Sequence, residues 1–172
     1  GAQLWAKQYN GSGNGEDRPS AIAVAGNKLY VTGFTTTNIA TNIDYATIQY
    51  DASSGTTLWM ATYHGPIPGY GNAQALVVDD SGSVYVTGSS ANTLDPIYGF
   101  PRADYVTIKY DVSGTEKWKT IYNGPGSKDD YPQAIALDHS NNVYVTGTSG
   151  SGFAGFDIAT VKYGQATVTV AG

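Results

Sequence analysis

The sequence has no cysteine, only two histidines and a single methionine. Without cysteine, a disulfide framework and a thiolate metal site are both excluded. Charged residues are scarce at 13%, and the net charge of -5 comes without any basic block, which argues against nucleic acid or an anionic membrane as a partner. No apolar run approaches the roughly 20 residues that cross a bilayer, so we expect no membrane insertion.

Glycine and tyrosine are abundant instead, with 22 and 14 copies among 172 residues. Together with many threonines and serines, they favour strands, tight turns and polar loops over helices. A hydrophobic content of 41% is enough for a sizeable core. The composition therefore predicts a globular all-β protein.

One motif occurs three times, as "NKLYVTG" at 27–33, "GSVYVTG" at 82–88 and "NNVYVTG" at 141–147. Tryptophans recur in step with it, at Trp5, Trp59 and Trp118. Each period contains four short runs that alternate as half-buried strands do, and only small turns separate the first from the second and the third from the fourth. Such turns join antiparallel neighbours, so each period predicts a four-stranded antiparallel meander.

Repeated meanders of this size are typical of β-propeller blades, which pack face to face around an axis. We predict an all-β fold with three blades inside residues 1–163, at about 19–63, 72–122 and 132–163. Residues 3–10 match the fourth strand of a blade, and the last blade lacks a proper fourth strand, so we expect 3–10 to complete it. Residues 164–172 are predicted to be a further strand or a linker.

The succession of "YVTG", "DYxTIxYD", a small turn, "W", "Y.G" and "AIALD" resembles the SBBP family over roughly residues 3–163. This bacterial and archaeal repeat is named for seven-bladed β-propellers, and the resemblance implies the propeller fold and an extracellular or cell-surface location. The stretch "YDASSGTTLW" is also similar, more weakly, to the tryptophan-containing turn of PQQ-type propellers. That second similarity implies a quinone-cofactor site, for which the chain offers only Arg18 and Arg102 as cations, so we expect no cofactor.

Three blades are too few to close a ring, because closed propellers have about four to eight. We therefore expect residues 3–10 to pair with residues 157–163 of a second copy, or with the missing blades of a longer parent chain. Such self-association by strand exchange gives a closed six-bladed ring or, where it does not close, a filament. The start at Gly1 without a methionine also favours a piece excised from a longer protein.

The long connections between strands differ from copy to copy and leave the meander at the same end, so we expect them to share one face. Aromatic and charged residues in these loops, above a rigid scaffold, suit recognition of a glycan or a peptide. The candidate ligand-binding residues are Tyr70, Asp95, Tyr98, Phe100, Arg102, Asp129, Asp130 and Tyr131. An alternative is that Tyr98 and Phe100 merely cover the blade beneath them.

No nucleophile elbow, phosphate loop or dinucleotide fingerprint is present, so we predict no catalytic residue and no metal ligand. Asp44, Asp104 and Asp157 recur at the start of the third strand of each blade. We expect each of these carboxylates to accept backbone N–H groups and to fix the end of the loop. The two histidines replace turn residues of the other copies, so a zinc pair is not expected.

These observations favour a non-catalytic extracellular or cell-surface module for adhesion, binding or assembly. The first alternative is a carbohydrate-active hydrolase or lyase, since two carboxylates suffice for such chemistry, and the loops carry Asp17, Asp95, Asp129 and Asp130. It requires a pair roughly 5 to 10 Å apart across a cleft, one of them with a raised pKa. The second alternative is a quinone-cofactor-binding propeller.

Overall fold

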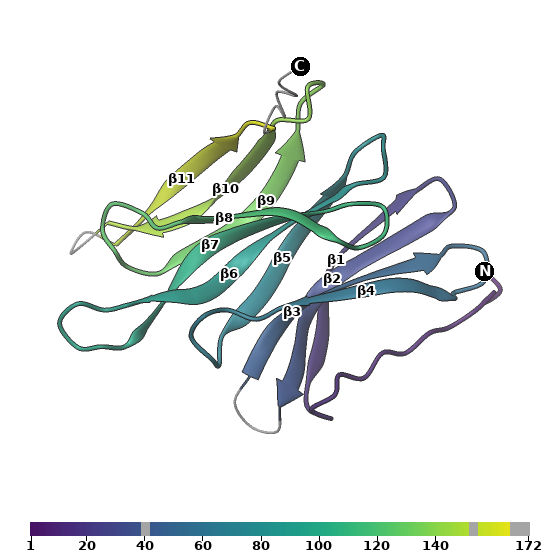
Figure 1. The fold of residues 1–172 in the computed structure, drawn as a ribbon, viewed down its shortest axis with the longest axis horizontal. Coiled ribbons are helices and arrows are strands. Elements are labelled where there is room, and N and C mark those ends of the chain that lie inside the picture. The colour runs from purple at the N-terminus through teal and green to yellow at the C-terminus, as the bar shows by residue number, and fades with distance from the viewer. Residues whose placement is uncertain (39–41, 152–154, 166–172) are drawn as a thin grey trace, which may run out of the picture.

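The computed structural model describes residues 1–38, 42–151 and 155–165. Eleven strands and no helix make up the regular structure of these residues (Figure 1). The strands are β1 (Asp17–Ala25), β2 (Lys28–Asn38), β3 (Asn42–Asp51), β4 (Thr57–Tyr63), β5 (Gly71–Val78), β6 (Val84–Leu94), β7 (Pro101–Tyr110), β8 (Glu116–Tyr122), β9 (Asp130–Leu137), β10 (Val143–Gly150) and β11 (Phe156–Tyr163). Within the described ranges, no apolar helix long enough to cross a membrane is found.

The strands form three antiparallel sheets, which lie side by side in Figure 1 from purple-blue through teal to yellow-green. Blade 1 has the order β1-β2-β3-β4, blade 2 the order β5-β6-β7-β8, and blade 3 the order β11-β10-β9. Every pair of neighbours along the chain within a sheet is antiparallel, so each sheet is a meander. The predicted all-β fold of propeller blades is confirmed.

The ends of the chain differ from a simple repeat of complete blades. Within the described residues of one chain, blade 3 has three strands, and residues 3–10 do not join it as a fourth. Those N-terminal residues form no strand and run along blade 1 instead. Their pairing with β11 of another copy stays a prediction. Gly164 and Gln165 lie outside any strand, and the rest of the predicted C-terminal strand or linker, 166–172, lies outside the described residues.

The last two residues of the YVTG motif contact both neighbouring strands. The motif threonine and a threonine on the next strand have hydroxyl oxygens about 3 Å apart in each blade, in the pairs Thr32–Thr47, Thr87–Thr107 and Thr146–Thr160. The motif glycine faces an irregularity in the preceding strand, where an added Cβ would lie 2.0 to 2.2 Å from a carbonyl oxygen. A side chain there would collide with backbone, so the motif residues allow the three strands to approach closely.

Aspartates stabilise the short turns that join neighbouring strands within a blade. In four turns the aspartate Oδ1 accepts a backbone N–H from the serine two positions later, at 2.9 to 3.0 Å, for Asp51, Asp79, Asp111 and Asp138. Asp79 and Asp138 also accept the hydroxyl of the motif tyrosine of their own blade, Tyr85 and Tyr144. These carboxylates therefore stabilise turns, as such residues do in loops generally.

The core lies between the blades and repeats from one junction to the next. Between blades 1 and 2, tyrosines of blade 1 meet aliphatic residues of blade 2, including Tyr30, Tyr45, Tyr63, Val84, Val86, Val106 and Ile108. Between blades 2 and 3, Tyr85 and Tyr105 meet Val143 and Val145 in the same way. Blades 1 and 2 thus present a tyrosine face to the following blade, and blades 2 and 3 present an aliphatic face to the preceding one.

Candidate functional site

The long loops lie together at one end of the blades, because the loop that enters a blade hydrogen-bonds to its second strand. In blade 1 the Gly13 N–H donates to the Thr36 carbonyl, at 3.1 Å. In blades 2 and 3 the second strand donates instead: the Ala91 N–H donates to the Tyr70 carbonyl at 3.0 Å, and the Gly150 N–H donates to the Asp129 carbonyl at 3.1 Å. The two kinds of long loop therefore form one surface.

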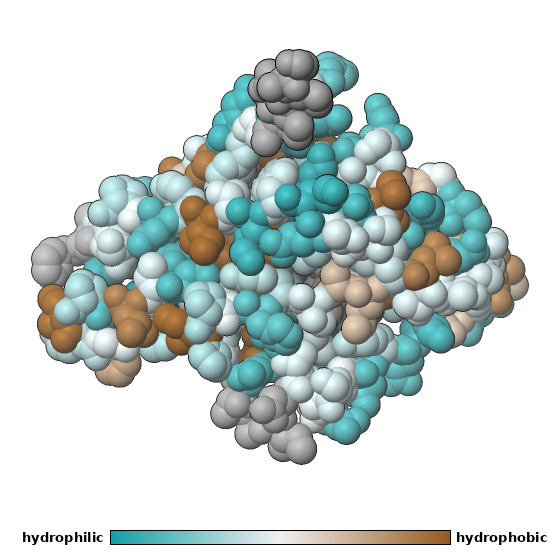
Figure 2. Space-filling model, viewed as in Figure 1, coloured by the Kyte–Doolittle hydropathy of each residue, from teal (hydrophilic) through white to brown (hydrophobic). Residues whose placement is uncertain are grey.

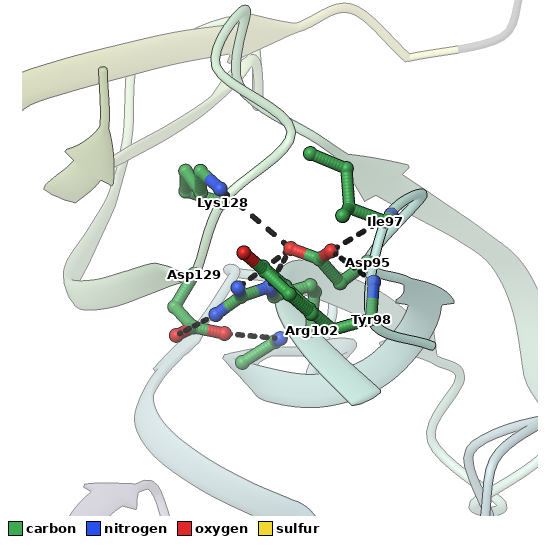
Figure 3. Close-up of polar contacts among 7 residues, drawn as sticks. Asp95, Ile97, Tyr98, Arg102, Lys128 and Asp129 are labelled. Atoms are coloured by element: carbon green, nitrogen blue, oxygen red, sulfur yellow. Dashed lines mark hydrogen bonds and ion pairs between the residues drawn. The ribbon is translucent and has the colours of Figure 1, made fainter. Parts of the chain in front are cut away.

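A network of charged side chains joins the β6–β7 loop to the β8–β9 loop (Figure 3). The Arg102 guanidinium donates to Asp95 Oδ2 at 2.7 Å through Nη2 and to Asp129 Oδ2 at 3.2 Å through Nη1. Lys128 Nζ lies 3.6 Å from Asp95 Oδ2, and the Ala103 N–H donates to Asp129 Oδ1 at 3.0 Å. Two loops that are far apart in sequence are thereby fixed to each other.

Asp95 also shapes its own turn. Its Oδ1 accepts the N–H groups of Ile97 and Tyr98, both at 2.9 Å, and its side chain is almost fully buried. The hydrogen bonds from Arg102, followed by these backbone groups, hold the pKa of Asp95 well below its usual range. Asp95 is therefore ionised at neutral pH and serves as the anchor of the hairpin.

The anchored hairpin carries a cluster of exposed hydrophobic side chains. We call this cluster the hairpin tip; it consists of Leu94, Ile97, Tyr98 and Phe100, whose exposed fractions are 56%, 77%, 71% and 63%. The rings of Tyr98 and Phe100 stack with centroids 6.3 Å apart. Figure 2 shows hydrophobic surface gathered at the lower left, over the end of the β6–β7 hairpin. The alternative that Tyr98 and Phe100 merely cover the blade beneath them is wrong.

The remaining predicted residues lie in the neighbouring loops. Tyr70 is 42% exposed in the β4–β5 loop, whereas Tyr131, at the start of β9, packs against Phe156 with ring centroids 6.0 Å apart. Asp130 is fully buried and accepts the Gly124 N–H at 2.7 Å. The same contact occurs in blade 1, between Asp17 and the Gly11 N–H at 2.9 Å. The contact of Asp130 with the backbone is thus structural and occurs in two blades. Of the predicted charged residues, Asp95, Arg102 and Asp129 are the ones that cluster at the base of the hairpin tip.

The aspartates at the start of each third strand do not behave alike. Asp104 is fully buried, and neither carboxyl oxygen has a hydrogen-bond partner in the described part of the chain. Burial, and after it the negative charge of Asp130, raises the pKa of Asp104 to about 7. Asp44 instead binds the Thr37 hydroxyl and lies 2.7 Å from His64 Nδ1. The prediction that backbone N–H groups satisfy these carboxylates is therefore wrong for Asp104.

Sequence reasoning missed some residues of this region. Leu94 and Ile97 precede the predicted aromatic pair in the sequence. Apolar residues in a predicted loop could have indicated that they belong to the same exposed cluster. The ion pair of Lys128 with Asp95 had no such signal, because the two residues are 33 positions apart and lie in different loops. Among the residues described, no three histidine, cysteine, aspartate or glutamate side chains are close enough to hold a metal ion.

Residues 117–154 match the family model of SBBP, which is described as a beta-propeller repeat. This segment is similar to an SBBP repeat. It begins in β8, the last strand of blade 2, and continues through β9 and β10 of blade 3. The match confirms the SBBP resemblance for residues 117–154, and no curated protein matches the chain.

Proposed function

We propose that this chain is a non-catalytic β-propeller module, outside the cell or on its surface, that binds a partner through the hairpin tip. The observation that carries the proposal is the contrast between the tip and its surroundings. Four large hydrophobic side chains project into solvent, while the charged side chains at the base of the hairpin are paired with one another. Exposed apolar groups grouped on a loop above a rigid scaffold are typical of interaction sites.

The base of the hairpin supports binding because it holds the tip in one conformation. Asp95 accepts two backbone N–H groups of the turn and pairs with Arg102, which itself pairs with Asp129 of the next loop. A loop fixed before binding loses less conformational entropy when a ligand arrives. The hairpin tip is therefore suited to a defined partner.

The chemistry of the hairpin tip favours an apolar segment of a protein over a glycan. Sugar hydroxyls need several hydrogen-bonding side chains beside the aromatic rings, whereas the nearby Arg102 and Asp129 are occupied with each other. Aromatic and aliphatic side chains without free charge match the hydrophobic centre of a protein interface. Glycan binding is an outcome that the experiment below tests.

The positions of the carboxylates support a non-catalytic role over the hydrolase or lyase alternative. Asp104 has a raised pKa beside Asp130, as a catalytic pair would, but both side chains have no exposed surface. Asp95 and Asp129 reach the surface region only as partners of Arg102. The quinone alternative finds little support, because Arg18 pairs with Glu16 and Arg102 with two aspartates.

The proposed location rests on composition and on the SBBP repeat. The strands are rich in threonine, serine, tyrosine and glycine, and only 13% of residues are charged. Fractionation of the producing cells, followed by protease treatment of intact cells, tests this part of the proposal. Protein that stays inside the cell and resists the protease would contradict it.

The binding proposal is tested with peptide and glycan arrays and a double variant, Tyr98→Ala with Phe100→Ala. We expect the native chain to bind a set of apolar peptides, and the double variant to lose about tenfold or more in affinity, as for aromatic anchors of interfaces. The control is Leu58→Ala, which removes a 49% exposed side chain on β4 and should leave binding unchanged. Binding only to glycans, binding that survives the double variant, or turnover of a glycan without array binding would each contradict the proposal.

A further inference from the structure

We infer that a second copy of this chain docks head to tail on blade 1. In this junction, residues 3–10 of one copy form the fourth strand of blade 3 of the other copy. The completed blade packs its tyrosine face on the open aliphatic face of blade 1, as the blades within one chain pack on each other. The inference does not depend on the hairpin tip. It concerns the two faces that point away from blade 2, one on blade 1 and one on blade 3.

The N-terminal segment already occupies the place of a fourth strand. At the junction of blades 1 and 2, Trp59 of β4 donates its Nε1–H to the Val112 carbonyl at 3.2 Å and lies over Gly114. Trp5 repeats both contacts one blade earlier, because its Nε1–H donates to the Ala52 carbonyl at 3.0 Å and its ring lies over Gly55. Residues 3–10 therefore sit on blade 1 as β4 sits on blade 2, although no strand pairs with them in the described part of the chain.

Among the described residues, only this segment covers the aliphatic face of blade 1. Ile48 and Tyr50 on β3 are 5% and 7% exposed, whereas Ile22 and Val24 on β1 are 67% and 66% exposed. The residues equivalent to these two in blade 2, on β5, pack against the core between the blades. A groove of about 300 Å³ remains between the segment and strands β1 to β3, on the side where the inner strands of a preceding blade would lie.

Blade 3, near the C-terminal end of the described residues, has an outer strand with one unpaired edge that complements the N-terminal segment. Its outer strand, β11, has a free edge within the described residues. Ile158 on β11 is 86% exposed, although the equivalent Tyr45 and Tyr105 of the other blades are 1% and 0% exposed. An apolar face beside an unpaired strand edge is a site for addition of a strand.

The two complete blades predict the register of the new strand pair. In blade 2, Tyr105, Thr107 and Lys109 lie opposite Tyr122, Thr120 and Trp118, and blade 1 has the same spacing between β3 and β4. Transferred to the junction, this register places Ile158 opposite Tyr9, Thr160 opposite Lys7, and Lys162 opposite Trp5. The tryptophan and tyrosine of residues 3–10 then occupy the positions of those in the complete blades.

The occupant is a second copy because one chain carries both halves of the missing contact. Among the described residues of one chain, 3–10 and β11 lie at opposite ends of the row of blades, with blade 2 between them, and a second copy brings them together. Such a contact joins two different surfaces and is repeated by every copy. Two copies that close on each other make a six-bladed ring, which is within the range of closed propellers.

A disulfide between the predicted partners tests the register directly. The chain has no cysteine, so Lys7→Cys with Thr160→Cys introduces the only thiols, at two exposed positions. Under mild oxidation we expect chains linked to each other, as covalent dimers for a ring or as a ladder for a filament. The control is Gln8→Cys with Thr160→Cys, which shifts one thiol to the opposite face of the strand and should remain unlinked. Equal linking of both variants, or of neither, would overturn the inference.

A complementation experiment tests the direction of the junction. Ile158→Glu and Ile22→Glu each place a charge on a side chain that is exposed in the single chain, so both variants should keep the native circular dichroism spectrum. Light scattering should give the native chain at least twice its 18.1 kDa mass and each variant alone at the monomer mass. An equimolar mixture should recover the doubled mass, because one intact junction remains. A monomeric native chain, or variants that assemble alone, would refute the inference.

Discussion

At the scale of single residues, Asp104 gives the stability of this protein an unusual dependence on pH. Its pKa is raised to about 7 in the folded state, from an ordinary value of 3.8. Between these two values the folded state binds more protons than the unfolded chain, so the free energy of unfolding falls as pH rises. The contribution of Asp104 is thus most favourable in acid and is lost above pH 7.

Replacement by the neutral amide tests this assignment. We expect Asp104→Asn to raise the melting temperature by several degrees at about pH 8, where the native carboxyl is ionised at a cost, and by clearly less at about pH 5. Thermal unfolding followed by circular dichroism measures both values. Asp80→Asn removes an exposed carboxyl of the β5–β6 turn and is the control, with no such difference. A shift of the same size at both pH values would show that Asp104 keeps one charge state throughout.

At the scale of elements, two turn glycines separate backbone strain from packing between blades. Gly26 and Gly114 have φ of 57° and 83°, a region that costs other residues about 1 to 2 kcal/mol. A Cβ on Gly26 meets nothing within 4 Å, whereas one on Gly114 would lie 2.7 Å from the Trp59 ring. In urea unfolding, Gly26→Ala should cost about 1 kcal/mol and Gly114→Ala clearly more. Equal losses would mean that the Trp59 ring moves aside freely.

The strands and their order within each blade were predictable from sequence because their determinants are local. Alternation of apolar residues, an aspartate or glycine in each tight turn, and the threefold recurrence of YVTG all act over a few positions. The position of Trp5 was not predictable, because its contacts with Ala52 and Gly55 imitate a blade junction across 47 or more residues. The pairing of Arg102 with Asp129 likewise depends on how two loops meet in space.

The candidate site was predicted more in its composition than in its arrangement. The exposed aromatic pair on the β6–β7 hairpin is where the sequence placed it, at Tyr98 and Phe100. Asp130, in contrast, is buried beneath the loop surface, because its carboxylate binds the Gly124 N–H within the blade. Asp129 and Asp130 are adjacent and alike in the sequence, and only packing decides which of them reaches solvent.

At the scale of the whole molecule, blade 2 should be the most stable part of a single chain. Its β6 is buried between two other blades, whereas blades 1 and 3 each leave one face open. In hydrogen exchange of the monomeric variant Ile158→Glu, we expect β6 amides to exchange most slowly and β1 and β11 amides fastest. Uniform protection across the three blades would show instead that they unfold as one unit.

The frame of the SBBP match has a consequence for how such chains grow by duplication. The matched segment starts in the last strand of blade 2 and ends inside blade 3, so the matched repeat and the folded sheet are out of phase. A tandem copy of one full period in this frame, from β8 to β11, adds a last strand for the existing sheet and the first three strands of a new one. Every array built in this way ties neighbouring sheets together by covalent overlap, and it always leaves one orphan strand and one unfinished sheet, whatever the number of copies.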